Sequence, residues 1–152
     1  MVCMGNICRS PMAEGVFRQM VQDASLSGKI EVDSAGTSAY HVGEKAHAGT
    51  LRVLSRLGIA YEGRSRQIER DDLDRFDYVL AMDRENLSYI RRASAGSTAE
   101  IGLFLSYARA AGLVGIDEVP DPYYDNTHDQ VYELVRRGCQ ALLDYIRSER
   151  GF

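Results

Sequence analysis

The run Tyr78-Val79-Leu80-Ala81-Met82 contains five consecutive apolar residues and no charged one. A continuous apolar run of this length is typical of a strand buried on both faces, as the strands of a parallel sheet are. On either side of this run, short apolar segments alternate with segments in which apolar residues recur at helical spacing. This alternation predicts an α/β fold, with a parallel sheet between two layers of helices.

Ser10 and Pro11 predict the start of a helix, because serine is a good N-cap and proline suits the first turn. An apolar stripe follows at helical spacing; it consists of Met12, Val16, Phe17, Met20 and Val21. Gly58 predicts the end of a second helix that carries Leu51, Leu54 and Leu57 on one face. The predicted helices after the first are 49–57, 71–76, 83–92 and 129–147. The last of them is amphipathic, and the residues predicted to face the core are Val131, Leu134, Val135, Leu142 and Ile146. The predicted strands are 30–32, 78–82 and 101–105, although the length of the last also allows a helix.

The composition is that of an ordinary globular protein, with 152 residues of which 45% are hydrophobic and 26% charged. This length predicts a single domain over residues 1–152. The net charge of −4 argues against a nucleic-acid binder. No apolar run approaches the roughly 18 residues of a membrane span, and no signal peptide is recognisable, so neither a membrane nor export is expected. Three cysteines exclude a complete disulfide framework, and we expect a cytoplasmic monomer, with a weak dimer as the alternative.

The segment Cys3-Met4-Gly5-Asn6-Ile7-Cys8-Arg9-Ser10 carries the chemistry. Five residues separate Cys3 from Arg9, directly before a predicted helix N-terminus. A loop of this length can turn several backbone N–H groups toward one centre, and the helix dipole adds to the resulting anion site. Gly5 permits close backbone approach, Asn6 tolerates positive φ, and Arg9 can bind two phosphate oxygens at once.

A cysteine at the mouth of such a loop is stabilised as a thiolate and can attack a bound phosphate monoester, forming a phosphocysteine intermediate. Ser10 can donate its hydroxyl to that thiolate. The leaving oxygen needs a proton, and Asp121, held between Pro120 and Pro122, is the candidate general acid and then base. The neighbouring Tyr123 and Tyr124 can form the walls of a pocket for an aryl phosphate.

These motifs resemble the low-molecular-weight protein tyrosine phosphatases, over nearly the whole chain. The matching blocks are Cys3 to Glu14, Val32 to Thr37, Phe76 to Asp83 and Asp121 to Tyr124. The resemblance implies a three-layer fold around a four-stranded parallel sheet and a mechanism without metal or cofactor. It implies phosphotyrosine-containing proteins or small aryl phosphates as substrates.

The resemblance also implies a role for each matching site residue. Cys3 would be the nucleophile, Arg9 the phosphate clamp and Asp121 the general acid and base. The phosphate-binding loop would consist of Met4, Gly5, Asn6, Ile7, Cys8 and Ser10, with Ser34 in support. Tyr40, Tyr123 and Tyr124 would wall the substrate pocket. Cys8 matches a second loop cysteine that can trap Cys3 as a reversible disulfide.

The sequence departs from the family pattern in three places. Gly63 stands where a histidine is usual, so one contact to the loop is expected to be lost or replaced. Residues 45–50 differ from the usual Pro-rich pattern, so the start of the helix there is expected to differ. Only Met1 and Val2 precede Cys3, where the family has a longer central strand. We therefore expect a truncated first strand and doubt that Met1 is the biological start.

Three alternatives remain open. A phosphoarginine phosphatase resembles this loop but carries threonine where Ile7 stands, which favours phosphotyrosine here. A thiol-dependent arsenate reductase needs further cysteines near the site, and Cys139 is predicted to be an inert core thiol. A non-catalytic phosphate-binding module is the third alternative.

Some other polar residues are predicted to have ordinary roles. The three histidines, His41, His47 and His128, show no metal-ligand spacing and are predicted to be solvated at the surface. Asp83 is predicted to cap a helix. The family resemblance implies that it also lies near the phosphate-binding loop.

Overall fold

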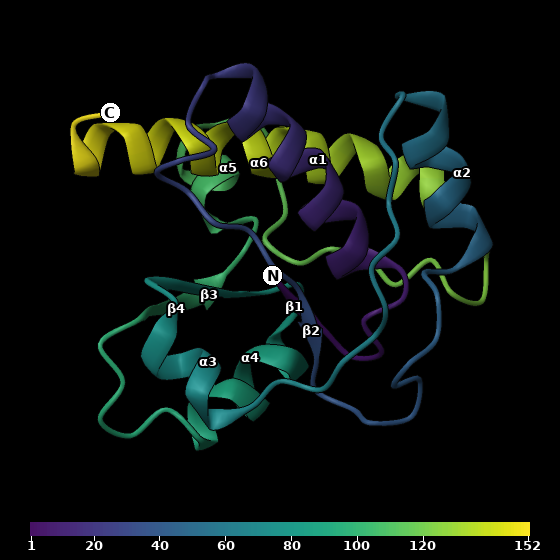
Figure 1. Ribbon diagram of the computed structural model, residues 1–152, viewed down its shortest axis with the longest axis horizontal. Helices are drawn as coiled ribbons and strands as arrows, with labels where there is room; N and C mark the ends of the chain where they lie inside the picture. The colour runs from purple at the N-terminus through teal and green to yellow at the C-terminus, as the bar shows by residue number, and fades with distance from the viewer.

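The computed structural model describes residues 1–152 and has a four-stranded sheet between two groups of helices (Figure 1). The strands are β1 (Val2–Cys3), β2 (Ala35–Gly36), β3 (Tyr78–Ala81) and β4 (Glu100–Leu103). The helices are α1 (Arg9–Asp23), α2 (Ala48–Arg56), α3 (Arg70–Arg75), α4 (Arg84–Arg92), α5 (Ser106–Ala110) and α6 (His128–Arg150). In Figure 1, α1, α2, α5 and α6 cover one face of the sheet, and α3 and α4 cover the other. No helix combines the length and the apolarity that crossing a membrane would require.

All strand pairs in the sheet are parallel, and the strand order is β2-β1-β3-β4. From β1 the chain crosses to one side to form β2, whereas β3 and β4 lie on the other side. The crevice between the carboxyl ends of β1 and β3 is therefore a topological switch point, which is where ligands bind in open α/β sheets. The loop Cys3–Ser10 and the residue Asp83 leave the sheet at this point.

Each face of the sheet has its own apolar core. On the α1 and α6 side, the side chains of Met12, Leu80, Phe104 and Leu142 are among the fully buried ones. On the α3 and α4 side, a smaller core joins Val79 of β3 to residues of both helices. Burying one such large apolar side chain contributes about 1.5–3 kcal/mol, so these two cores hold the layers together.

Most predicted elements are confirmed, with boundaries that differ by a few residues. The run Tyr78–Ala81 is a central strand, and Glu100–Leu103 settles the ambiguous segment as a strand. Gly58, at φ +74°, follows the end of α2 as predicted. Leu57, which was predicted to face the core, is exposed, and Val53 is buried in the core instead. Leu134 is half-buried and only borders the core that α6 covers. The short α5 was not predicted.

Two local predictions are wrong. Ser10 does not cap α1, because Cys8 occupies the N-cap position and the Ser10 hydroxyl turns toward Cys3. Residues 30–32 are not a strand, and β2 contains only Ala35 and Gly36. The register explains this second difference: Val2, the first residue of β1, pairs with Ala35, so residues 30–34 extend beyond β1 and have no ladder partner.

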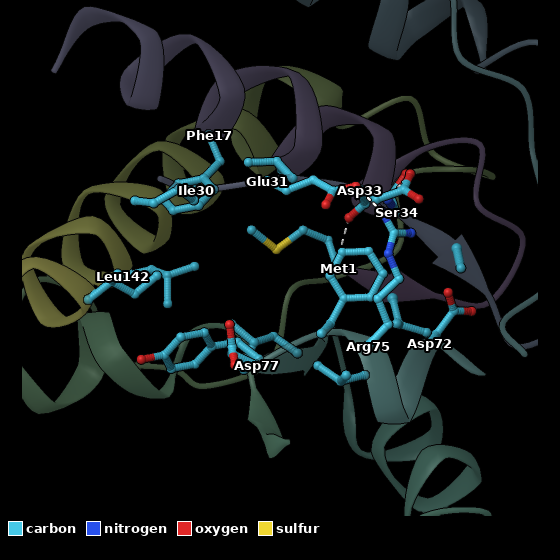
Figure 2. A pocket seen from close by; sticks show the side chains of 18 of the residues that line it. Met1, Phe17, Ile30, Glu31, Asp33, Ser34, Asp72, Arg75, Asp77 and Leu142 are labelled. Atoms are coloured by element: carbon cyan, nitrogen blue, oxygen red, sulfur yellow. Dashed lines mark hydrogen bonds and ion pairs between the residues drawn. The ribbon is translucent and has the colours of Figure 1, made fainter. Parts of the chain in front are cut away.

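A cavity of about 330 Å³ lies in line with β1, beyond Met1 (Figure 2). Its sides include the segments 29–35 and 75–80, which lead into the two strands that pair with Val2 and contain their first residues. The Met1 nitrogen is buried at its inner end and donates to the Asp33 carbonyl at 3.1 Å. Burial lowers the pKa of this amine. β1 is thus a two-residue strand, as expected, and the cavity lies in line with it.

The cavity predicts that residues joined ahead of Met1 will stabilise the fold if they can form a strand. We expect a Val-Thr-Val-Thr-Val extension to raise the free energy of unfolding by about 2 kcal/mol, since new burial and hydrogen bonds exceed the ordering cost. Denaturant unfolding measures the change. A Gly-Ser-Gly-Ser-Gly extension is the matched control and should leave stability unchanged. Equal effects of the two extensions would show that the cavity does not accept a strand.

Candidate active site

The loop from Cys3 to Arg9 joins the end of β1 to the start of α1, and Asn6 gives it its shape. The backbone of Asn6 has φ 55°, one of three positive values among the non-glycine residues. Its buried side-chain amide donates to the hydroxyls of Ser10 (2.8 Å) and Ser34 (2.9 Å) and accepts the backbone N–H of Arg66 (3.0 Å). These three bonds offset the cost of the left-handed conformation and fix the loop against β2 and the segment after α2.

The backbone N–H groups of this loop directly precede α1, whose N-terminus is the positive end of the helix dipole. Apart from Asn6, whose N–H donates to the Cys3 sulfur at 3.2 Å, none of them has an acceptor within the protein. The unpaired groups belong to Met4, Gly5, Ile7, Cys8, Arg9 and Ser10. Unpaired N–H groups in a loop before a helix form a binding site for a tetrahedral anion.

The Cys3 sulfur lies at the base of this loop and is buried. It is 3.0 Å from the Ser10 hydroxyl and accepts the Asn6 N–H. A thiolate at this position would therefore have two hydrogen-bond donors in addition to the helix dipole. Burial, followed by the charges of Asp121 and Cys3, raises the pKa of the Cys8 thiol to about 12. Both loop cysteines are free thiols.

A chain of buried hydrogen bonds supports Ser34 from behind. The Ser34 hydroxyl donates to the Glu14 carboxylate, which also accepts from the Tyr61 hydroxyl at 2.8 Å and pairs with Arg18. Burial and the charge of Glu14 raise the pKa of Tyr61, so it stays a donor. A buried carboxylate is stable only when its oxygens are satisfied in this way. The side chains from Glu14 through Ser34 to Asn6 therefore form one connected support for the loop.

Arg9 is held in place by groups from two other loops. Its Nη1 donates to the Asp83 carboxylate at 2.6 Å and to the Val119 carbonyl at 3.0 Å, and its Nη2 lies 3.7 Å from the Asp121 carboxylate. Burial lowers the pKa of Arg9, but the nearby charges of Cys3, Asp83 and Asp121 raise it more, so the guanidinium stays charged. Asp83 also caps α4 by accepting the Asn86 N–H at 2.9 Å. One carboxylate thus aligns both the arginine and a helix.

Asp121 projects from a loop that is attached to the sheet. The Val119 N–H donates to the Met82 carbonyl at 2.8 Å, just after β3 ends. One oxygen of Asp121 accepts the Tyr123 N–H at 3.1 Å, while the other faces Arg9. Its side chain is 37% exposed, so a proton can reach it from solvent. This oxygen can therefore exchange a proton with a group bound beside Arg9.

The predicted aromatic residues line the rim of the site. Tyr123 lies 4.8 Å from Tyr124, ring centre to ring centre, and 6.0 Å from His41 of the neighbouring loop, which in turn contacts Tyr40 at 4.8 Å. Tyr40 and Tyr124 are 85% and 87% exposed, so each offers a free ring face. Met4 is also exposed, whereas Ile7 is buried with the base of the loop.

The two other departures from the family pattern have local explanations. Gly63 leaves room for Tyr61, since a Cβ there would lie 2.6 Å from the hydroxyl that binds Glu14. In the same segment, the Ser65 hydroxyl contacts the loop by donating to the Gly5 carbonyl at 2.8 Å. In the segment 45–50, the ring of His47 caps α2 by accepting the Gly49 N–H at 3.0 Å.

Sequence reasoning missed several residues of the site. Glu14, Tyr61, Ser65 and Arg66 contact the loop or its supporting residues only through the tertiary fold. The histidines are not solvated as predicted: His128 is fully buried, and His41 and His47 are half-buried. Cys139 is buried in the core as predicted, and burial raises the pKa of its thiol.

Comparison with known proteins gives consistent matches over the whole chain. The family model described as low molecular weight phosphotyrosine protein phosphatase matches residues 1–151. The Bacillus subtilis low molecular weight protein-tyrosine-phosphatase YfkJ is 44% identical over 151 residues, covering 98% of this chain and 95% of the relative. The protein-tyrosine-phosphatase PtpA of Staphylococcus epidermidis is 39% identical over 145 residues, covering 95% and 90%.

Solved structures agree with the sequence matches. The crystal structure of YfkJ has a TM-score of 0.91 at 43% identity, and the match covers 97% of this chain and 92% of that one. A Drosophila arginine phosphatase has a TM-score of 0.89 at 29% identity, covering 96% and 95%. The predicted resemblance and fold class are confirmed: the chain belongs to the low molecular weight phosphotyrosine protein phosphatase family, which is a family of hydrolases.

Proposed function

We propose that this enzyme hydrolyses phosphotyrosine and related aryl phosphate monoesters through a phosphocysteine intermediate. The observation that carries the proposal is the set of unpaired N–H groups in the loop 4–10, grouped before α1 with the Cys3 sulfur and the Arg9 guanidinium. A phosphoryl group bound by these donors would lie directly above the sulfur. The same donors would stabilise the equatorial oxygens of the transition state.

In the first step, the Cys3 thiolate attacks phosphorus. The sulfur–phosphorus bond forms as the bond to the phenolic oxygen breaks. Asp121 gives its proton to that oxygen, so the product leaves as a neutral phenol. Asp121 can do this because its free oxygen faces the guanidinium that binds the phosphoryl group.

In the second step, Asp121 takes a proton from water, and the water oxygen attacks phosphorus. The sulfur–phosphorus bond breaks and returns the electron pair to Cys3. The Ser10 hydroxyl, 3.0 Å from the sulfur, and the Asn6 N–H, 3.2 Å from it, stabilise the departing thiolate. Phosphate then leaves, and no metal or cofactor takes part.

The rim favours a planar aromatic leaving group. Tyr40, Tyr123 and Tyr124 offer ring faces on which a phenol can stack, and Ile7 adds no polar group to the loop. Likeness to a Drosophila arginine phosphatase supports phosphoarginine as the second candidate. We further propose that the enzyme is cytoplasmic, since its three free thiols suit a reducing compartment, and that it acts as a monomer.

Peptides that carry phosphotyrosine, phosphoserine or phosphoarginine in one sequence context test the proposal directly. We expect kcat/KM for the phosphotyrosine peptide to exceed the others by about tenfold or more, because only a phenol stacks on the rim. Cys3→Ser is the blank and should lose at least about 10³-fold in turnover while still binding phosphate. Faster turnover of phosphoarginine would overturn the substrate assignment. Phosphate binding without any turnover would favour a non-catalytic module.

Asp121→Asn should separate good leaving groups from poor ones. The variant cannot donate a proton, so the rate constant of the first step should fall about 10²–10⁴-fold for an alkyl-like or phenolic phosphate. The same rate constant should fall much less for a strongly activated aryl phosphate, whose leaving oxygen needs no proton. Burst kinetics, which resolve formation of the intermediate from its hydrolysis, provide the measurement. Equal slowing of both substrates would contradict a general acid at this position.

Asp83→Asn should weaken the alignment of Arg9 without removing the helix cap. Asparagine can still accept the Asn86 N–H, so we expect only about 1–2 kcal/mol of lost stability from the altered pair with Arg9. We expect kcat/KM to fall by about tenfold, on the order of 1.4 kcal/mol. The exposed Glu85, in the same first turn, gives the matched control Glu85→Gln. The proposed role of Asp83 fails if both variants retain full kcat/KM.

A further inference from the structure

Three metal-ligating side chains meet beside the catalytic loop. Cys8 comes from the loop itself, His47 from the N-cap of α2 and His128 from the first residue of α6. The Cys8 sulfur and one ring nitrogen of each histidine all lie within 4.8 Å of one another. Residues separated by up to 120 positions in the sequence thus bring one sulfur and two nitrogens together.

His128 is the second and independent observation. It is fully buried, and neither of its ring nitrogens has a hydrogen-bond partner. Its ring stacks on that of His47, with ring centres 4.7 Å apart and planes at 18°. Gly49 makes room for it, since a Cβ at that position would lie 2.4 Å from the His128 Nδ1. An imidazole buried without partners is costly, and a bound ion is one of the few ways to satisfy it.

We propose that Cys8, His47 and His128 form a binding site for Zn²⁺. One thiolate and two imidazoles are a donor set that suits zinc, whereas magnesium and calcium require oxygen ligands. Three protein ligands leave the fourth tetrahedral position for water. The site is distinct from the Cys3 sulfur and does not depend on the proposed phosphatase activity.

Zinc binding requires small changes in the three ligands. Ligand atoms of a tetrahedral zinc site lie about 3.5 Å apart, so the three atoms must approach one another by about 1 Å. The zinc–sulfur bond forms as the Cys8 thiol releases its proton to solvent. Zinc binding also breaks the hydrogen bond from the Gly49 N–H to the His47 Nδ1. If Nδ1 binds the ion, its lone pair is used; if Nε2 binds the ion, Nδ1 carries the ring proton.

The position of Cys8 connects this site to the catalytic loop. The Cys8 N–H is one of the unpaired loop donors, and its carbonyl accepts the Thr50 hydroxyl at 3.0 Å. An ion bound to the Cys8 sulfur would therefore connect the loop to α2 and α6. It would also prevent that sulfur from reacting with other groups.

Zinc titration of the Cys3→Ser protein tests the proposal, because this background removes the catalytic thiolate as a competing ligand. We expect one Zn²⁺ per chain, measured by calorimetry and by competition with a chromophoric chelator. Co²⁺ in place of zinc should give the visible bands of a tetrahedral site and a sulfur-to-cobalt charge-transfer band. Absence of stoichiometric binding by about 100 µM free zinc would overturn the proposal.

Variants of each ligand separate this site from others. His128→Phe replaces the ring by one of similar shape, and His47→Asn retains an N-cap residue, so both should fold. We expect each to weaken zinc binding at least tenfold, and Cys8→Ser to remove the charge-transfer band. The matched control is His41→Gln, which removes a histidine outside the cluster and should bind zinc as before. Circular dichroism verifies folding, and undiminished binding by folded His128→Phe would contradict the assignment.

Discussion

Asn6 turns the chain in a left-handed conformation between Cys3 and Arg9, and the rest of the site depends on that turn. Its side-chain amide donates to the hydroxyls of Ser10 and Ser34 and accepts the backbone N–H of Arg66. Apart from that of Asn6, which donates to the Cys3 sulfur, the loop N–H groups have no partner within the protein and remain available to a ligand. The buried carboxylate of Glu14 holds Ser34 in turn, so the shape of the loop rests on a network that begins within α1.

The topology of the sheet brings the second half of the site to the first. Because β1 and β3 are neighbours, the loop after β1 and the residues after β3 leave the sheet side by side. Asp83 can therefore bind Arg9, and Val119, attached to Met82, carries Asp121 toward the same guanidinium. Arg9 is the common partner of two segments that are distant in sequence. Its long side chain is ordered before any ligand arrives, which reduces the entropic cost of binding.

Local sequence predicts the parts of this structure that depend on local physics. The apolar run Tyr78–Ala81 predicts a buried strand, and the spacing from Cys3 to Arg9 before a helix predicts the anion loop. The strand predicted at 30–32 is wrong because pairing depends on how far β1 extends, which is a property of another segment. Ser10 would be a good cap in isolation, but the tertiary fold supplies Cys3 as a partner for its hydroxyl.

The burial of a side chain, like the pairing of a strand, cannot be predicted from its neighbours in the sequence. His128 lies among polar residues in the sequence, so its neighbours predict exposure, but the packing of α6 on α2 buries it. Glu14 and Tyr61 likewise find each other across 47 positions, and no spacing rule connects them. The loop that carries the proposed nucleophile could therefore be predicted from one short segment, whereas the residues that support this loop could be found only from the fold.

The unpaired N–H groups of the loop have a consequence for how the enzyme responds to its surroundings. Under the proposed function, they would bind the three oxygens that every phosphate monoester shares with inorganic phosphate, and only the rim residues Tyr40, Tyr123 and Tyr124 would contact what differs between substrates. The reaction product would then compete for the same donors as the substrate. Free phosphate would act as a competitive inhibitor, and the rate of the enzyme would reflect phosphate abundance as well as the supply of phosphorylated substrate.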